Sequence, residues 1–412
     1  MIRNYKYRLY PHEGTETALG IVLEASRQLY NTSLEHRNLN YKDRKHSVNY
    51  YDQANELTTL DDPVFDLLHS QVKQDVLRRL QKSFDAFFRR LKSGNGEKPG
   101  FPRFKGKNRY HSFTYPQSTG FAVNPTRKGH AKLRLGNLGK IDMRYHRPIP
   151  RNAKMKTCTV LRKNRKWYAV ISLELPDVPR RKDLGDPLGI DVGLEKFLTD
   201  SDGEKVPNPR FYRKAEDKLK KEQRKLAKRQ GGHKGEKKSN NYKRQSFKVA
   251  RHHEKVANRR GDFQFKTAQG IVRQSPLIKV EALRIRNMIG NHKLAKSIAD
   301  AGWGTFFRIL ESKAEEAGGL VMYVNPSGTS QTCLCGEKVP KDLSVRVHKC
   351  PACGLVMDRD EVSARLVQVA EPVKISRTGT VRSHACGDSG DLTGRLVGVT
   401  GSLNQEKFPS SK

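Results

Sequence analysis

The chain has 412 residues, with 80 Lys or Arg against 43 Asp or Glu, which gives a formal net charge of +37 and a pI near 10.1. Because single hydrophobic cores stop growing at about 250 to 300 residues, this length predicts two or three domains. The charge predicts a polyanionic partner, most simply nucleic acid. We find no run of about 18 apolar residues and no apolar leader core, so we expect no membrane partner and a cytoplasmic location.

The first part of the chain predicts a β domain interrupted by helices. Residues 3–10 alternate like a strand and stop at Pro11, and from there to residue 95 the apolar spacing is helical. The stripe that ends in Phe87 and Phe88 favours helix core over a surface for base stacking. Short alternating runs fill residues 96–180. We therefore expect a β-barrel or sandwich from residues 1–11 and 96–180, with residues 12–95 as an inserted helical lobe.

Two basic segments are candidate nucleic-acid contacts. The sequence KPGFPRFKGK at 98–107 mixes aromatic and basic residues in a Gly- and Pro-rich turn, which suits phosphate contacts with occasional base stacking. Residues 213–260 carry 19 Lys or Arg against 5 Asp or Glu. Apolar residues recur seven positions apart in two series, Leu219 with Leu226 and Val249 with Val256. This spacing predicts two helices that pack as an antiparallel hairpin, with their basic faces outward. The candidate phosphate contacts are Arg103, Lys105, Lys107, Arg224, Lys228, Arg251 and Arg259.

Three carboxylates stand at the ends of expected elements. Asp191 lies in an apolar strand, where a carboxylate is costly unless it is paired, hydrogen-bonded or bound to metal; a turn aspartate near Gly193 is the alternative. Glu281 ends a second apolar strand, and Asp360 opens a short helix. This is the layout of a ribonuclease H-like (RuvC-like) α/β nuclease core, in which such acids hold two Mg²⁺ ions.

Two close cysteine pairs, Cys333 with Cys335 and Cys350 with Cys353, precede the third acid. Their spacing predicts a zinc ribbon over residues 326–355 with one structural Zn²⁺, against the alternative of four unconnected reduced thiols. Cys-Leu-Cys is one residue shorter than the usual pair, so His348 is a possible replacement for one sulfur. We expect Cys158 and Cys386 to be free thiols.

The chain resembles the transposon-encoded TnpB family, the ancestors of the compact type V CRISPR effectors. The resemblance covers about residues 3–367 and rests on YKYRLYP, GFPRFK, GIDVGLEKF, KVEAL, DAGWGTF, CPACG and DRDE. It implies an α+β multidomain protein: a wedge-like β-barrel with an inserted helical recognition lobe, then a RuvC-like core (181–325 and 356–373) interrupted by the zinc ribbon.

The resemblance also implies a function. Members are prokaryotic, nucleoid-associated RNA-guided DNA endonucleases, which bind a guide RNA from the transposon end and cut duplex DNA beside a short motif, and we expect a monomer in the ribonucleoprotein. By position, Asp191, Glu281 and Asp360 are the magnesium-binding catalytic acids, the four cysteines bind zinc, and Tyr50 and Gln74 face the adjacent motif.

This sequence departs from the family after Glu361, where Asn-Ala-Ala is usual and Val362-Ser363-Ala364 stands here. Asp358 is therefore kept as an alternative third acid. Two other functions stay open: an RNA-guided transcriptional repressor with a weakened nuclease site, and a transposase that joins strands itself. Residues 374–412 are polar and aperiodic, so we expect a disordered tail.

Overall fold

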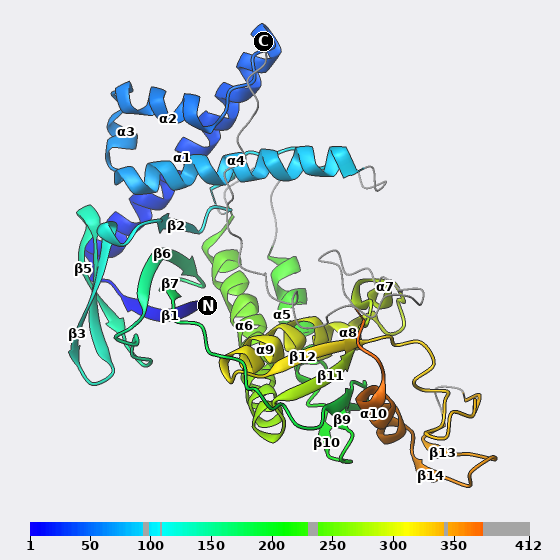
Figure 1. Ribbon diagram of the computed structural model, residues 1–412. Helices are drawn as coiled ribbons and strands as arrows, with labels where there is room; N and C mark the ends of the chain where they lie inside the picture. The colour runs from blue at the N-terminus through cyan, green and yellow to red at the C-terminus, as the bar shows by residue number, and fades with distance from the viewer. Residues whose placement is uncertain (94–98, 108, 230–237, 342–344, 374–412) are drawn as a thin grey trace, which may run out of the picture. The chain divides into compact units, whose positions relative to one another are not determined.

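The computed structural model describes residues 1–93, 99–107, 109–229, 238–341 and 345–373, which form two compact units, the second beginning at Val178 (Figure 1). Cys386 and the expected disordered tail lie outside the described residues. Among the described helices, none is both long and apolar enough to cross a membrane.

The first unit is built on one antiparallel sheet of seven strands. β1 (Ile2–Tyr10) lies in its middle, between β7 (Lys166–Glu174) and β5 (Gly139–Arg144). Alternate side chains of β1, at Tyr5, Tyr7 and Leu9, are buried, as the alternating sequence predicts. The other strands are β2 (Ser112–Tyr115), β3 (Phe121–Arg127), β4 (His130–Leu135) and β6 (Lys154–Lys163), in the order β2-β6-β7-β1-β5-β4-β3, with short 3₁₀ turns η1 (Ser118–Gly120) and η2 (Gly136–Leu138). These strands form one continuous ladder from β2 to β3, built from the two stretches in which the sequence predicted a β domain.

The helices of the first unit follow β1 in the chain. They are α1 (Glu13–Arg44), α2 (Tyr50–Thr59), α3 (Pro63–Asp66) and α4 (Ser70–Ser93). One hydrophobic core joins α1 and α4 to the sheet. The stripe is core as far as Leu80, but its end is not: Phe88 is 51% exposed, Phe87 is half-buried, and the Phe87 ring contacts those of Phe88 and Phe101. Helical periodicity shows which face of a helix is apolar, but it does not show where along the helix the packing partner ends.

The second unit contains a mixed sheet of five strands in the order β10-β9-β8-β11-β12. β8 (Leu188–Asp191), β11 (Leu277–Glu281) and β12 (Leu320–Val324) are parallel, while β9 (Lys196–Asp200) and β10 (Lys205–Pro207) are antiparallel to their neighbours. Parallel strands that helices cover on both faces have continuous apolar sequences, which explains why β8, β11 and β12 are mostly apolar.

The helices of the second unit are α5 (Phe211–Lys228), α6 (Asn240–Gln274), α7 (Ile285–Ile289), α8 (Ala295–Ala301), α9 (Trp303–Glu316) and α10 (Arg359–Val369). α5 packs on α6 as the expected hairpin, with Leu219, Val249 and Val256 buried. Ile190 and Val280 of the sheet share a core with Phe306 and other residues of α9, and α6 packs on α9. β13 (Val347–Lys349) and β14 (Val356–Asp358) form a small hairpin before α10.

Candidate active site and metal centre

Asp191 and Glu281 lie side by side at the carboxyl ends of two neighbouring strands. β8 and β11 are parallel, and their register pairs Lys279 with Gly189 and Val280 with Ile190. The next position of that register brings Glu281 beside Asp191. Because alternate residues of a strand point to opposite faces, the two carboxylates share the face of Gly189 and Lys279.

Helix α10 packs on that face and brings the third acid. A Cβ atom on Gly189 would lie 2.1 Å from the carbonyl oxygen of Ala364 and 2.6 Å from the nitrogen of Gln368, so the helix backbone rests directly on β8. Asp360 precedes Ala364 by about one helical turn, and Asp191 follows Gly189 by two strand residues. Asp360 lies close enough to Asp191 for its charge to raise the pKa of Asp191.

Lys279 fixes the other end of α10. Its Nζ donates to the carbonyl oxygens of Gln368 (2.7 Å) and Ala370 (2.9 Å), at the carboxyl end of the helix. A cation there complements both the unpaired carbonyls and the helix dipole. β11 thus holds α10 at its last turn through Lys279, while Glu281, two residues further along the same face, lies at the end where α10 begins.

The electrostatics of the site follow from burial and from the neighbouring charges. Burial raises the pKa of Asp191 well above its ordinary value, and the charges of Glu281 and Asp360 raise it further, against a smaller opposing effect of Arg359. Burial also raises the pKa of Glu281. A bound cation would stabilise carboxylates that repel one another in this way.

Asp358, the alternative third acid, has other partners. Its Oδ1 accepts from the backbone nitrogen of Asp360 (2.9 Å), which makes it the N-cap of α10, and its Oδ2 accepts from Lys205 (2.7 Å). Burial acts to raise the pKa of Asp358, but the Lys205 and backbone hydrogen bonds outweigh it and leave the pKa below its ordinary value. The geometry therefore favours Asp360 over Asp358 as the third ligand.

Sequence reasoning missed Thr329, which lies in the loop after β12. Its hydroxyl donates to Oε1 of Glu281 at 2.5 Å, and its own carbonyl accepts from the hydroxyl of Ser363 (3.3 Å). Val362, where the family has a polar residue, is 1% exposed and contributes no polar atom. Thr329 could have been found from its position after β12, because the loops that follow parallel strands meet at the edge of the sheet where Glu281 lies.

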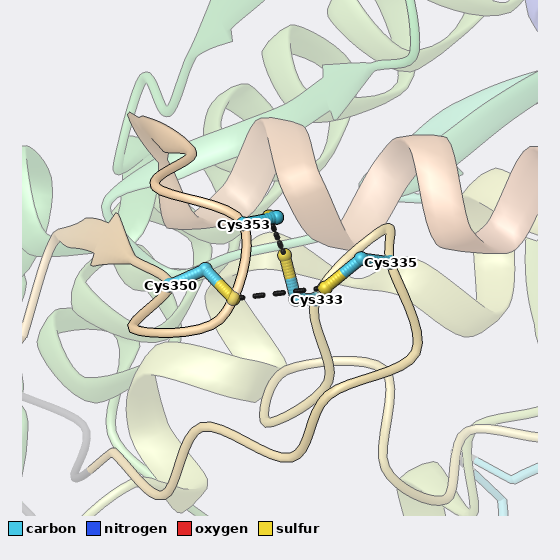
Figure 2. A group of neighbouring side chains, drawn as sticks. All are labelled: Cys333, Cys335, Cys350 and Cys353. Carbon is cyan, nitrogen blue, oxygen red and sulfur yellow. Dashed lines mark hydrogen bonds between the residues drawn. The ribbon is translucent and has the colours of Figure 1, made fainter.

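The four cysteine sulfurs converge from two loops (Figure 2). Their Sγ atoms all lie within 4.8 Å of one another, with 3.6 Å between Cys333 and Cys353 and 3.7 Å between Cys335 and Cys350. Zinc–sulfur bonds of about 2.3 Å in a tetrahedron require sulfur separations of roughly 3.8 Å. The donor set therefore fits one tetrahedral Zn²⁺ ion.

Both loops have the same backbone turn despite the short Cys-Leu-Cys spacing. Gly336 and Gly354, each directly after the second cysteine of its pair, have φ values of +91° and +73°, a region that favours glycine. The backbone nitrogen of Cys353 lowers the pKa of Cys350 to about 7, whereas burial raises the pKa of Cys333 and the neighbouring thiols raise that of Cys353. His348 is not needed to replace a sulfur, because the four cysteines complete the group without it, and its Nδ1 contacts Lys341.

The basic candidates lie on exposed surfaces of both units. Arg103 and Lys107 are exposed, whereas Lys105 is half-buried, with its backbone nitrogen bonded to Asn31 (2.7 Å) and its Nζ 5.3 Å from the ring centre of Tyr30. On the α5–α6 hairpin the exposed candidates are Arg224, Lys228, Arg251 and Arg259.

The two residues expected to face the adjacent motif lie on neighbouring helices of the first unit. Gln74 is exposed on α4, and Tyr50 begins α2, with the guanidinium of Arg78 5.5 Å from its ring centre. Arg78 is one helical turn after Gln74, so these three side chains belong to one surface.

Three family models match the chain. They are described as a probable transposase of the IS605 OrfB type (residues 170–292), a Cas12f1-like TNB domain (303–367) and a helix-turn-helix domain (1–46). The last description does not fit the structure, where residues 1–46 form β1 and the single helix α1.

Full-length relatives and a solved structure extend these matches. A putative RNA-guided DNA endonuclease of Streptomyces pristinaespiralis is 30% identical over 94% of this chain and 91% of the relative. The putative RNA-guided DNA endonuclease InsQ of Escherichia coli K12 is 27% identical over 90% and 92%. A Cas12f1–sgRNA–target DNA complex superimposes with a TM-score of 0.58 at 12% identity, over 89% of this chain and 98% of that one, which shows a shared fold.

The class that these matches define is that of IS605 OrfB-type chains with a TNB domain. With full-length relatives at this level of identity, the chain belongs to the TnpB family.

Proposed function

We propose that this chain is an RNA-guided DNA endonuclease of the TnpB type, which takes a guide RNA from the end of its transposable element and cuts duplex DNA beside a short motif. The observation that carries the proposal is the convergence of Asp191, Glu281 and Asp360 at one edge of the second sheet. The names of the two full-length relatives support the same activity.

The three carboxylates are the proposed catalytic ligands of two Mg²⁺ ions. When bound, such ions supply an activated water and a counter-charge for the leaving oxygen of the phosphodiester. Asp191 and Glu281 keep fixed positions because they end paired strands, and Asp360 because α10 is held at both ends. Thr329 orients the Glu281 carboxylate through its hydroxyl.

The four cysteines hold one structural Zn²⁺ in this proposal. The second pair lies in the loop of the β13–β14 hairpin, and β14 ends at Asp358, the N-cap of α10. Fixing the two loops to one ion therefore also fixes the start of the helix that carries Asp360.

The basic surfaces would hold the nucleic acids, with Arg103, Lys105 and Lys107 in the first unit and Arg224, Lys228, Arg251 and Arg259 in the second contacting phosphates. Tyr50 and Gln74 would face the duplex motif, while guide pairing reads the rest of the target. The first unit would serve as the wedge and recognition part and the second as the nuclease, in a monomeric ribonucleoprotein.

The proposal is tested by purifying the protein from cells that carry its native flanking DNA and sequencing the RNA that co-purifies. The complex is then given Mg²⁺ and a plasmid library with a guide-matched target and randomised flanks. We expect cleavage beside one fixed motif. Guided binding with no cleavage would contradict the proposed nuclease and favour the repressor function. Strand joining without a guide would favour the transposase function.

A further inference from the structure

The first unit contains a basic cavity that the nuclease mechanism does not use. Its volume is about 570 Å³, and it is lined by α1, by the segment before β2 and by the turn between β6 and β7. Its cationic lining residues are Lys107, Arg162, Lys163 and Arg165, and Glu24 is its acidic one. Glu24 is paired with Arg27 at 2.6 Å, and this hydrogen bond lowers the pKa of Glu24, so the lining keeps a positive balance.

The β6–β7 turn holds Arg165 in a backbone conformation that favours glycine. Lys163 pairs with Lys166, and the two residues between them, Asn164 and Arg165, have φ values of +49° and +59°. Two-residue turns of this kind prefer Asn-Gly, because only Gly adopts the second position without strain. An arginine there costs stability, and strained positions of this sort are concentrated at functional sites.

Gly20 is a second costly choice at the same cavity. It lies within the 32-residue helix α1, where glycine is less stable than alanine. No atom lies within 4 Å of the position that its Cβ would occupy, so an alanine would fit. Gly20 instead leaves this part of the cavity wall open. The unfavourable turn residue and the unfavourable helix residue therefore share one cavity.

We propose that this cavity binds the phosphates of a single nucleic-acid strand, with Lys163 and Arg165 joining Lys107 as direct contacts, a role that rests on the proposed function. Cations supplied by different segments around a concavity suit a flexible backbone that can bend into it, whereas a duplex presents a broad convex surface. The strand is either an unpaired part of the guide RNA or a displaced DNA strand. Both supply the same phosphodiester chemistry.

The test uses the full chain and fluorescence anisotropy with labelled single strands of about 20 nucleotides, one of RNA and one of DNA with the same sequence, over a salt series. For Arg165→Gly we expect Kd to weaken by about tenfold and the log–log salt slope to fall by about 0.7, the value for one lost phosphate contact. The Tm should stay the same or rise by up to about 4 °C, because the turn is relieved of strain.

Two further variants make the result specific. Arg165→Lys keeps the charge and should retain most of the affinity. Lys128→Gln removes one charge from the exposed β3–β4 turn of the same unit and should change Kd by less than about twofold. The strand type that loses more affinity with Arg165→Gly identifies the natural ligand, and equal losses mean that the cavity recognises phosphate alone.

The proposal is overturned if Arg165→Gly binds both strands with the wild-type Kd and salt slope, or if Lys128→Gln loses as much affinity. A lower Tm for Arg165→Gly would overturn the argument from backbone strain. Because the readout is binding without cleavage, this result is independent of whether the protein cuts DNA.

Discussion

Replacing Gly189 by alanine should separate the catalytic acids without touching any of them. The new Cβ would lie 2.1 Å from the oxygen of Ala364 and 2.9 Å from the Cα of Gln368, and these are backbone atoms that no rotamer change can move. Relief requires α10 to shift by roughly 1 Å, since non-bonded carbon contacts lie near 3.5 Å. We expect a loss of about 1 to 3 kcal/mol of stability and, because a 1 Å misplacement can cost about a hundredfold in rate, a cleavage rate lower by about 10².

The assay is single-turnover cleavage of a matched plasmid by the ribonucleoprotein, with Tm measured on the same preparations. Gly270→Ala is the matched control: Gly270 lies in α6 with open space at its Cβ position, so alanine should stabilise the helix by about 0.5 to 1 kcal/mol and leave cleavage unchanged. If Gly189→Ala cuts at the wild-type rate with an unchanged Tm, α10 does not rest on β8 as described.

Three further predictions concern the zinc site, Glu281 and the α5 helix. Cys350→Ser should lower bound zinc and Tm together, measured by metal analysis and thermal unfolding, whereas Cys158→Ser should keep the zinc. Thr329→Val should raise the Mg²⁺ concentration for half-maximal cleavage by about tenfold or more, and Thr329→Ser should restore it. Hydrogen bonds from Lys296 and Lys220 lower the pKa of Glu216 to about 2. A lowered pKa gives stability that is present above the ordinary value of 4.5 and is lost as the pH falls toward 2, so wild type and Glu216→Gln should differ in Tm at pH 6 and converge near pH 2.

Each of these predictions has a result that would contradict it. Full zinc occupancy in Cys350→Ser would remove that cysteine from the site. Equal Mg²⁺ dependence of wild type and Thr329→Val would mean that the threonine hydroxyl does not orient Glu281. A constant difference in Tm between wild type and Glu216→Gln from pH 6 to pH 2 would mean that the Lys296 and Lys220 bonds do not lower that pKa.

The residues that could be predicted from the sequence are those whose chemistry conflicts with their surroundings. Asp191 and Glu281 were visible because a carboxylate is costly in an apolar strand, and the cysteines because of their spacing. The strand β1 and the helix that starts near Asp360 were visible from periodicity and turn residues.

The residues that escaped prediction act through contacts between distant segments. Thr329 reaches Glu281 from 48 positions away, and Lys279 reaches the end of α10 from 89 positions away. From the sequence alone, Gly189 suggests only a turn. Its role, which is to let the backbone of α10 approach β8 closely, depends on a helix about 170 residues later in the chain. The exposure of Phe88 likewise depends on long-range packing.

The most direct test of the proposed active site compares guided cleavage by wild type, Asp191→Asn and Glu361→Gln, each loaded with the same guide RNA and Mg²⁺. The Asn variant keeps the shape of the side chain and removes the proposed metal ligand, while Glu361 is paired with Arg365 at 2.8 Å and serves as the control acid. We expect all three proteins to bind the matched target, wild type and Glu361→Gln to cut it, and Asp191→Asn to leave it uncut. Cleavage by Asp191→Asn at the wild-type rate would show that the active site lies elsewhere.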